Sequence, residues 1–266
     1  MATVRRNIGV RINDYRADVR GGLSIASRQA FSAVELGVDR GEVAPANLSE
    51  SGRRHLARLV ANTGMAFAAL AQESHGARLA DPSRVDEAVT RAAQVLRLAA
   101  DMHVPVVSHE VGELLDLADA ERASALEALR TLAEQAERVG TIYAVRSALA
   151  DPATIAELVR AVDCPLVRVS VDPGALLMAG YDPAEALATL GDRVSLAYVR
   201  DAIRGSAGRG GREAGLGAGS LDLPAYLAAL SAGGYHAAPI LRRAEANDPV
   251  AALAADRDRL VSELAV

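Results

Sequence analysis

Several side chains that could carry out chemistry stand within or directly after short apolar runs. Glu35 lies in AVELG, His109 and Glu110 end VPVVSHE, and Asp172 follows VRVSV. Carboxylates and imidazoles transfer protons or bind metal ions, whereas arginine is a permanent cation that holds oxyanions. The other polar residues in such positions are Arg11, Gln72, Glu73, His75, Arg146, Tyr198, Arg200, Asp201, Arg242 and Arg243. These residue types suit proton transfer, metal binding or anion recognition.

The elements that must position these residues alternate along the whole chain of 266 residues. Short runs rich in Val and Ile are followed by longer segments with helical spacing, a pattern that predicts repeated strand and helix units. The predicted strands are residues 7–12, 33–37, 66–71, 104–109, 141–146, 167–171, 194–199 and 238–242. Eight strands favour a closed barrel over an open sheet. We therefore predict an α/β fold with one domain, a (β/α)8 TIM barrel over residues 1–266, whose chemistry lies at the C-terminal strand ends.

The intervening segments carry helix start and stop signals. Residues 49–64 begin with Ser49 as the N-cap and end at Gly64. Segments 81–102 and 119–140 have the same pattern, with Asp near the start and arginines on the outer face. A long glycine-rich connection, residues 204–223, follows the seventh strand. It is either a flexible surface connection or a mobile lid over the barrel mouth.

Composition excludes several classes of protein. A net charge of −5 with 3% aromatic residues argues against a nucleic-acid partner. No apolar run is long enough to span a membrane, and the first residues lack the features of a secretory signal, so we expect a cytoplasmic protein without a membrane partner. The single cysteine rules out an intrachain disulfide and a multi-cysteine metal site. All 29 basic Lys/Arg positions are arginine, which excludes chemistry that needs a lysine amine.

Three stretches together resemble the sugar phosphate isomerase/epimerase superfamily, the xylose isomerase-like barrels that include ketose 3-epimerases, inosose dehydratases and endonuclease IV. They are FSAVELG at the second strand, residues 140–202 across strands five to seven, and residues 216–243 leading into the eighth. The resemblance covers most of the chain. It implies a TIM barrel acting on a small sugar-like or anionic substrate, with a homodimer as a possible assembly.

The family's metal ligands are mostly replaced in this sequence. Members of the superfamily usually bind a divalent ion through Glu, Asp, His and Glu at the ends of strands five to eight. By the resemblance, these positions fall on Arg146, Asp172, Tyr198 and Arg242. Because arginine has no lone pair to offer a metal ion, we expect no metal cofactor at this place. The chain is in this respect a divergent member of the group.

The replacements suggest a different use of the same site. Arg146 and Arg242 would substitute fixed positive charge for the ion, binding substrate and stabilising an enolate or oxyanion. Asp172 is then either the ion-pair partner of these two arginines or a general base. Tyr198 either donates a proton or fills the vacated volume. Arg11 either completes an anion site or pairs with Glu35 across the barrel.

The remaining candidates leave further alternatives. His109 could be a general acid or base oriented by Glu35 or Glu110. A relocated metal site could instead combine His75 and His109 with Asp172 and Glu110. Without such a metal, His75 and Glu110 are expected to contact substrate. Arg200 is expected there too, although it and Asp201 could form a salt bridge that anchors the following loop.

Three functions follow from these alternatives. The first is a metal-independent isomerase, epimerase or lyase that moves protons with His109, Asp172, Tyr198 and Glu35 as catalytic residues. The second is a catalytically silent barrel that serves as a binding protein or a partner subunit. The third is a metal-dependent isomerase with a relocated metal site. An open, arginine-lined cavity favours an enzyme or an anion binder, and a mouth filled by its own side chains favours the silent barrel.

Overall fold

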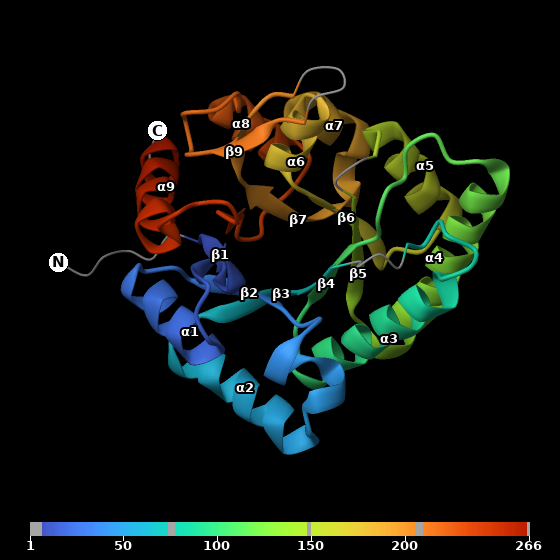
Figure 1. Cartoon of the computed structure of the whole chain (residues 1–266), viewed down its shortest axis with the longest axis horizontal. Helices are drawn as coiled ribbons and strands as arrows, with labels where there is room; N and C mark the ends of the chain where they lie inside the picture. The colour runs from blue at the N-terminus through green and yellow to red at the C-terminus, as the bar shows by residue number, and fades with distance from the viewer. Residues whose placement is uncertain (1–6, 74–77, 148–149, 206–209, 265–266) are drawn as a thin grey trace.

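The strands form one closed, parallel barrel (Figure 1). The structure is a computed structural model and describes residues 7–73, 78–147, 150–205 and 210–264. Around the barrel the order is β1, β10, β7, β6, β5, β4, β3, β2. The strands are β1 (Gly9–Arg11), β2 (Ala33–Gly37), β3 (Ala66–Gln72), β4 (Val106–Glu110), β5 (Ile142–Arg146), β6 (Val167–Val171), β7 (Val194–Val199) and β10 (Ile240–Leu241). This confirms the predicted TIM barrel and each of its eight strands. The last strand is shorter than predicted, because Pro239 has no amide hydrogen to extend the ladder.

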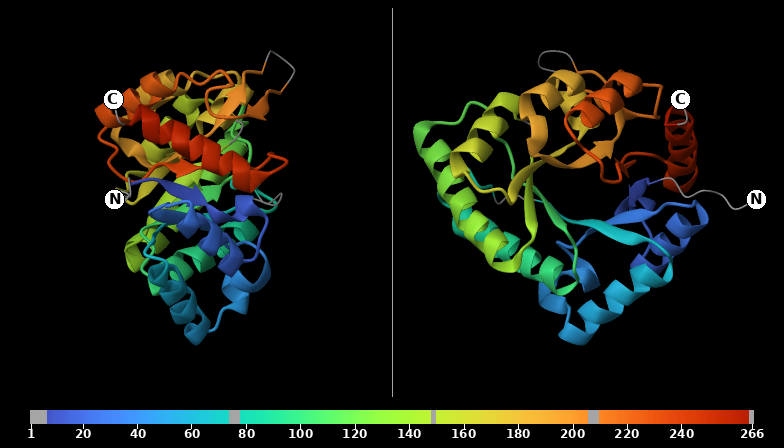
Figure 2. Two further views of the ribbon diagram at one scale, coloured as in Figure 1. Left: turned by 90° about the vertical axis from the view of Figure 1, so that its left-hand side faces the viewer. Right: turned by 180° about the vertical axis from the view of Figure 1, so that it is seen from behind.

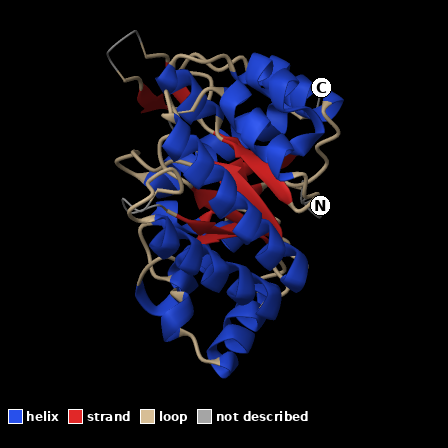
Figure 3. Ribbon diagram, turned by 90° about the vertical axis from the view of Figure 1, so that its right-hand side faces the viewer, coloured by secondary structure: helices blue, strands red, loops and turns tan. Residues whose placement is uncertain are grey.

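Helices cover the outside of the barrel, and Figure 3 shows the strands enclosed by them. Ser49 caps α2 by accepting the amide of Gly52, as predicted. None of the helices in the described segments is long and apolar enough to cross a bilayer. The helices are α1 (Val19–Arg28), α2 (Glu50–Asn62), α3 (Val85–Asp101), α4 (Asp119–Val139), α5 (Pro152–Val162), α6 (Pro173–Ala179), α7 (Pro183–Leu190), α8 (Leu223–Ala232) and α9 (Pro249–Glu263). Short 3-10 turns lie at Ile12–Tyr15, Gly41–Val43, Pro45–Asn47 and Gly191–Arg193.

Successive side chains of each strand point alternately outward and inward, so the fold has two separate apolar cores. Val107 and Val145 point outward into the large core between strands and helices. Ala69, Ala144 and Leu196 point inward into a small core inside the barrel. Because successive strand residues face opposite sides, the next inward positions toward the C-terminal strand ends meet at the barrel mouth. The chain places charged residues at most of these positions.

The described residues of the connection after β7 include regular secondary structure. Strand β8 (Asp201–Ile203) pairs antiparallel with β9 (Arg212–Ala214), outside the barrel wall (Figures 2 and 3). Beyond β9, the buried carboxylate of Asp201 accepts the amides of Gly217, Gly219 and Leu221 at 2.9, 3.0 and 3.0 Å. Part of the predicted lid, residues 206–209, lies outside the described residues. The predicted Arg200–Asp201 salt bridge is wrong, because Asp201 binds these amides and Arg200 turns to other carboxylates.

Candidate functional site

One side of the barrel mouth is built around Arg146 at the end of β5. Its guanidinium donates to Glu110 at 3.0 Å and to Glu73 at 3.0 Å. The same Glu73 oxygen accepts from Arg11, at the end of β1, at 2.7 Å. Arg11 also faces Glu35 at 3.8 Å, so the predicted ion pair between them forms, although at a distance too long for a hydrogen bond. Glu73 therefore links two arginines from strands that are not neighbours.

The other side of the mouth is built around Asp172, the N-cap of α6. One carboxylate oxygen accepts the amide of Ala175 at 3.1 Å, which fixes the side chain. The other oxygen accepts from Arg242 at 3.1 Å and from Arg200 at 3.3 Å. The prediction that Asp172 pairs with Arg242 is thus confirmed. Pairing with Arg146 is wrong, because Glu73 and Glu110 already hold that guanidinium.

Tyr198 lies fully buried between these two sides. Its hydroxyl donates to Glu35 at 2.6 Å and lies 2.9 Å from Ser108, which continues to Ser170 at 2.9 Å. The guanidinium carbons of Arg242 and Arg146 lie 5.2 and 5.8 Å from the centre of the phenol ring. Burial, followed by the charge of Glu35, raises the pKa of Tyr198 well above its usual range. The phenol is therefore a neutral hydrogen-bond donor flanked by two cations.

Glu213 in β9 is a member of this site that the sequence did not reveal. Its carboxylate accepts from Arg200 at 2.8 Å and from Arg243 at 3.2 Å. It also accepts the amides of Ala244 and Glu245, each at 3.1 Å. The residue lies inside the glycine-rich segment, far from any predicted strand end. The sequence offers one weak signal: Glu213 is one of very few acidic residues in that loop.

The arginines keep Glu73 and Asp172 ionised. Burial alone would raise the pKa of Glu73, but Arg146 and Arg11 outweigh it and hold that pKa far below its usual range. Burial opposes a similar effect at Asp172, where Arg200 and Arg242 keep the pKa lowered. Arg146 and Arg242 are themselves only 6% and 8% exposed. Each mouth guanidinium therefore already has a carboxylate partner from the chain itself.

His109 takes a different place from the one that acid-base catalysis requires. It shares a side of β4 with Val107, so its ring points toward the helices and away from the barrel interior. The ring nitrogen Nδ1 lies 2.6 Å from the Tyr143 hydroxyl, so neither Glu35 nor Glu110 orients it as predicted. Burial, reinforced by Arg146, lowers the pKa of His109 to about 3. The imidazole is neutral at physiological pH.

The residues at the four expected metal positions do not fit a divalent ion. Arg146 and Arg242 offer no lone pair, and Tyr198 holds its proton. Asp172 is the only carboxylate among the four, and its oxygens accept two guanidinium groups and one amide. The described segments contain no group of three or more His, Cys, Asp or Glu residues that could hold a metal ion elsewhere. His75, part of the relocated site considered above, lies outside the described residues.

Several buried polar atoms at the mouth have no hydrogen-bond partner within the described part of the chain. They are Nη1 of Arg11, Oε2 of Glu35, and Nε of Arg146 and of Arg242. Arg11 Nη1 and Glu35 Oε2 face each other at 3.8 Å, and Arg242 Nε lies 4.0 Å from Asp14, so these charges attract without a hydrogen bond. A buried polar group left without a hydrogen bond costs free energy in proteins. A cluster of these atoms in one place is typical of functional sites rather than of barrel cores. The mouth is therefore the candidate functional site.

Comparison with known proteins gives one family and many similar structures. The family described as "Xylose isomerase-like TIM barrel" matches residues 23–261. None of the curated proteins matches the chain. A xylose isomerase domain protein from Planctomyces limnophilus superposes with a TM-score of 0.84 at 16% identity, covering 97% of this chain and 96% of that chain.

Two further structures carry names of enzymes. An L-ribulose 3-epimerase superposes with a TM-score of 0.78 at 16% identity, covering 97% of this chain and 94% of that one. A probable 3-DHS dehydratase, AsbF, from Bacillus anthracis gives a TM-score of 0.78 at 12% identity, covering 96% of this chain and 99% of that one. Proteins with this fold thus include an epimerase and a probable dehydratase. At such low identity the likeness concerns the fold alone.

Proposed function

This chain belongs to the xylose isomerase-like TIM barrel family, and we propose that it catalyses proton transfer on a small polyhydroxylated substrate without a divalent metal. The reaction class is isomerisation, epimerisation or elimination. One observation carries the proposal: two guanidinium groups, from Arg146 and Arg242, flank the Tyr198 ring at the positions where relatives are expected to hold a metal ion. Fixed cations there supply the charge that a developing enolate oxygen needs.

The chemistry is proton transfer beside a carbonyl group. A mouth carboxylate removes the proton from the adjacent carbon, and the electron pair moves to the carbonyl oxygen, which Arg146 and Arg242 stabilise. Asp172 and Glu73 are both ionised, so either one can remove the proton and, having taken it up, return it to the neighbouring carbon. The Tyr198 hydroxyl donates a hydrogen bond to Glu35, and the Tyr198 ring contacts the guanidinium groups of Arg146 and Arg242 and positions them. His109 has no part in this step, because its ring faces the helices.

The charges of the mouth favour an uncharged substrate over an anion. Every arginine of the site is already paired with a carboxylate, and Glu73 is the most open member, with 30% of its side chain exposed. A phosphate or carboxylate would have to displace one of these carboxylates and would meet Glu73 first. Hydroxyl groups can donate to the carboxylates and accept from the arginines without that cost. A sugar or polyol is therefore the substrate class that we propose.

A second function, the catalytically silent barrel, is favoured by one specific observation. The low exposure of Arg146 and Arg242 and the full burial of Tyr198 mean that the chain's own side chains occupy most of the mouth. In that case the ion pairs hold the barrel together in place of a metal ion. Such a protein would bind a ligand or a partner subunit without turning a substrate over. The experiment below separates the two functions.

The test follows hydrogen exchange into substrate. Chelator-treated protein is incubated in deuterated water with D-fructose or L-ribulose, and deuterium beside the carbonyl is measured by mass spectrometry. We expect exchange that added Mn, Co or Mg does not change. Asp172→Asn and Glu73→Gln should each lower the rate at least a hundredfold. Arg122→Gln, which removes an exposed ion pair with Glu157 on the helices, should leave it unchanged.

Each outcome of the deuterium-exchange experiment leads to a different conclusion. Exchange that appears only after a metal is added would return the protein to metal-dependent chemistry. No exchange with any sugar would favour the silent barrel. Equal rates in Asp172→Asn, Glu73→Gln and the unmodified chain would show that the mouth carboxylates are not the bases.

A further inference from the structure

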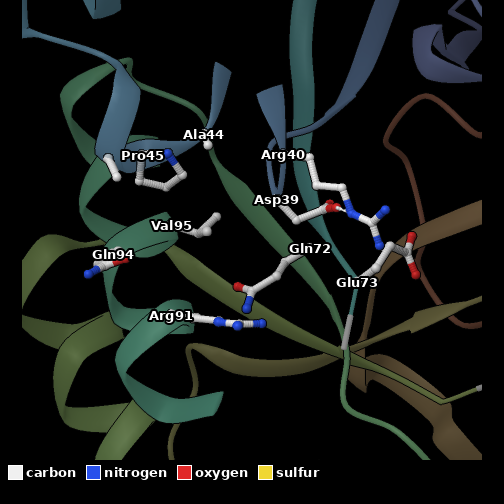
Figure 4. Close-up of a pocket in the computed structure, with 10 residues that line it drawn as sticks. Asp39, Arg40, Ala44, Pro45, Gln72, Glu73, Arg91, Gln94 and Val95 are labelled. Atoms are coloured by element: carbon white, nitrogen blue, oxygen red, sulfur yellow. Dashed lines mark ion pairs between the residues drawn. The ribbon is translucent and has the colours of Figure 1, made fainter. Parts of the chain in front are cut away.

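A cavity opens beside the mouth and shares only Glu73 with the mechanism proposed above. It has a volume of about 400 Å³, which lies in the range of small-molecule pockets. Three segments form it: the turns that follow β2, the end of β3, and one face of α3 (Figure 4). The side chains used below are Pro45, Gln72, Glu73, Arg91, Gln94 and Val95. The cavity is thus built by segments far apart in the sequence.

Gln72 gives the cavity an unsatisfied polar group. The residue is only 3% exposed, and its Oε1 has no hydrogen-bond partner within the described segments. Figure 4 shows its amide turned toward Arg91 and Gln94. A buried amide without a partner is costly unless a ligand or water completes it. Gln72 therefore indicates that this cavity takes a ligand with hydrogen-bonding groups.

The lining defines the chemistry of that ligand. Two carboxylates, Asp39 and Glu73, are balanced by two guanidinium groups, Arg40 and Arg91, so the cavity favours neither an anion nor a cation. The amides of Gln72 and Gln94 add both donors and acceptors.

One wall, with Pro45 and Val95, is apolar, and none of the described residues that line the cavity carries an aromatic ring for a base to stack on. An uncharged sugar ring matches this combination, since its hydroxyls meet the polar groups and its C–H face meets the apolar wall.

Glu73 connects this cavity to the mouth. One of its carboxylate oxygens accepts from Arg11 and Arg146, while the side chain also lines the cavity. Its other oxygen accepts no hydrogen bond from the described residues, which leaves it available to a hydroxyl group. A molecule that reaches from the mouth into the cavity must therefore pass Glu73.

We propose that the cavity is a second sugar subsite and that the barrel acts on a glycoside, whose reacting unit lies at the mouth while its linked sugar lies in this cavity. The inference rests on the proposed function for the identity of the reacting unit. The subsite itself rests on Gln72, on the balanced charges and on Glu73. It predicts that a disaccharide with a keto sugar at one end binds better than the keto sugar alone.

The test uses isomaltulose, a glucosyl-fructose, and D-fructose with the full-length protein. Saturation-transfer NMR reports which protons contact the protein, and deuterium exchange reports turnover. Ala46→Trp fills the cavity from an exposed alanine in its wall. Gln94→Ala removes an exposed amide. The matched control is Ala188→Trp, at an exposed alanine on α7, which Figure 1 places on the other side of the barrel.

We expect saturation transfer to the glucosyl protons of isomaltulose in the unmodified protein and in Ala188→Trp. The signal should fall at least fivefold in Ala46→Trp and be weaker in Gln94→Ala. The exchange rate at limiting substrate should be at least tenfold higher for isomaltulose than for D-fructose, and Ala46→Trp should remove this preference without slowing D-fructose. Glucosyl signals that are equal in Ala46→Trp and Ala188→Trp would overturn the subsite.

The failure of the two proposals can be told apart. If no sugar exchanges deuterium but the glucosyl signal is present and lost in Ala46→Trp, the subsite stands and the proposed proton transfer is wrong. If D-fructose exchanges as fast as isomaltulose and the glucosyl protons receive no saturation, the proton transfer stands and the subsite is wrong.

Discussion

Individual carboxylates at the mouth each serve two guanidinium groups. Asp172 holds Arg200 and Arg242, and Glu73 holds Arg11 and Arg146. Removing one carboxylate therefore takes a partner from two buried cations at once, which is more costly than losing a surface ion pair. This sharing explains why activity tests at these residues need amide replacements of the same shape, with folding checked by circular dichroism.

His109 provides a prediction at the scale of one residue. Its folded-state pKa is about 3, whereas an unfolded histidine has a pKa of about 6.5. Below pH 6.5 the unfolded state therefore binds a proton that the folded state does not, so stability falls as the pH falls toward 3. His109→Gln removes this contribution, worth about 1.4 kcal/mol per pH unit in that window.

The measurement is urea unfolding at pH 7 and pH 5. Between these values the unmodified chain should lose about 2 kcal/mol more than His109→Gln. Contributions from the mouth carboxylates cancel in this comparison, because both proteins contain them. An equal loss in the two proteins would show that His109 is protonated in the folded state.

The sequence predicted some site residues better than others. Arg146, Asp172, Tyr198 and Arg242 could be found because each stands at a strand end, and strands are predicted by their apolar alternation. The pairs Asp172–Arg242 and Arg11–Glu35 were predicted, but the roles of Glu73 and Glu213 as shared partners were not, because side chains of similar length reach several partners. Glu213 was missed because a glycine-rich segment gives no periodic signal.

At the scale of elements, the connection after β7 is held by two buried carboxylates. Asp201 accepts four backbone amides, including its neighbour Ala202 at 2.7 Å, and Asp256 of α9 accepts the amide of Leu216 at 2.9 Å. Because this connection leads from β9, it fixes Glu213 against Arg200. The conformation of this connection therefore determines how Glu213 contacts Arg200 at the mouth.

Gly219 is one of the positions in this connection where the surroundings leave no room for a side chain. A Cβ atom on Gly219 would lie 2.1 Å from the Asp201 carboxylate and 2.7 Å from the Ala202 carbonyl oxygen. Gly219→Ala should therefore cost about 1–3 kcal/mol, the usual range for overpacking, and lower the melting temperature by several degrees. Gly210→Ala in the same connection meets no atom within 4 Å and is the matched control. Equal melting temperatures for the two variants would contradict this account.

The barrel strands could be predicted from sequence, but the β8–β9 hairpin could not. The strands of the barrel are buried runs of Val, Ile and Ala, which the alternating pattern identifies. Strand β9 reads Arg-Glu-Ala between glycines and has no strand character of its own. It forms because the fold places it beside β8 and because Glu213 gains four hydrogen bonds there. Tertiary contacts decide such an element.

At the scale of the whole molecule, the proposed metal-independent function predicts that divalent ions do not stabilise the folded state. A ligand that binds only the folded state raises its melting temperature in proportion to affinity and concentration. We expect Mn, Co or Mg at 1 mM, compared with a chelator, to change the melting temperature of the untagged protein by less than about 1 °C. The measurement is differential scanning calorimetry. A clear rise with one ion would reveal a metal site, including one that involves His75.

The shared carboxylates also limit how such a mouth can change over generations. Arg242→Glu, a step toward the ligand set of metal-binding relatives, would put a second carboxylate beside Asp172 and leave Arg200 to neutralise both. Arg146→Glu would do the same beside Glu73 and Glu110. Each first step would therefore weaken the protein before any later step could assemble an ion-binding set. Under the proposed function, a mouth of this kind would therefore regain a metal site only through variants less stable than the present chain.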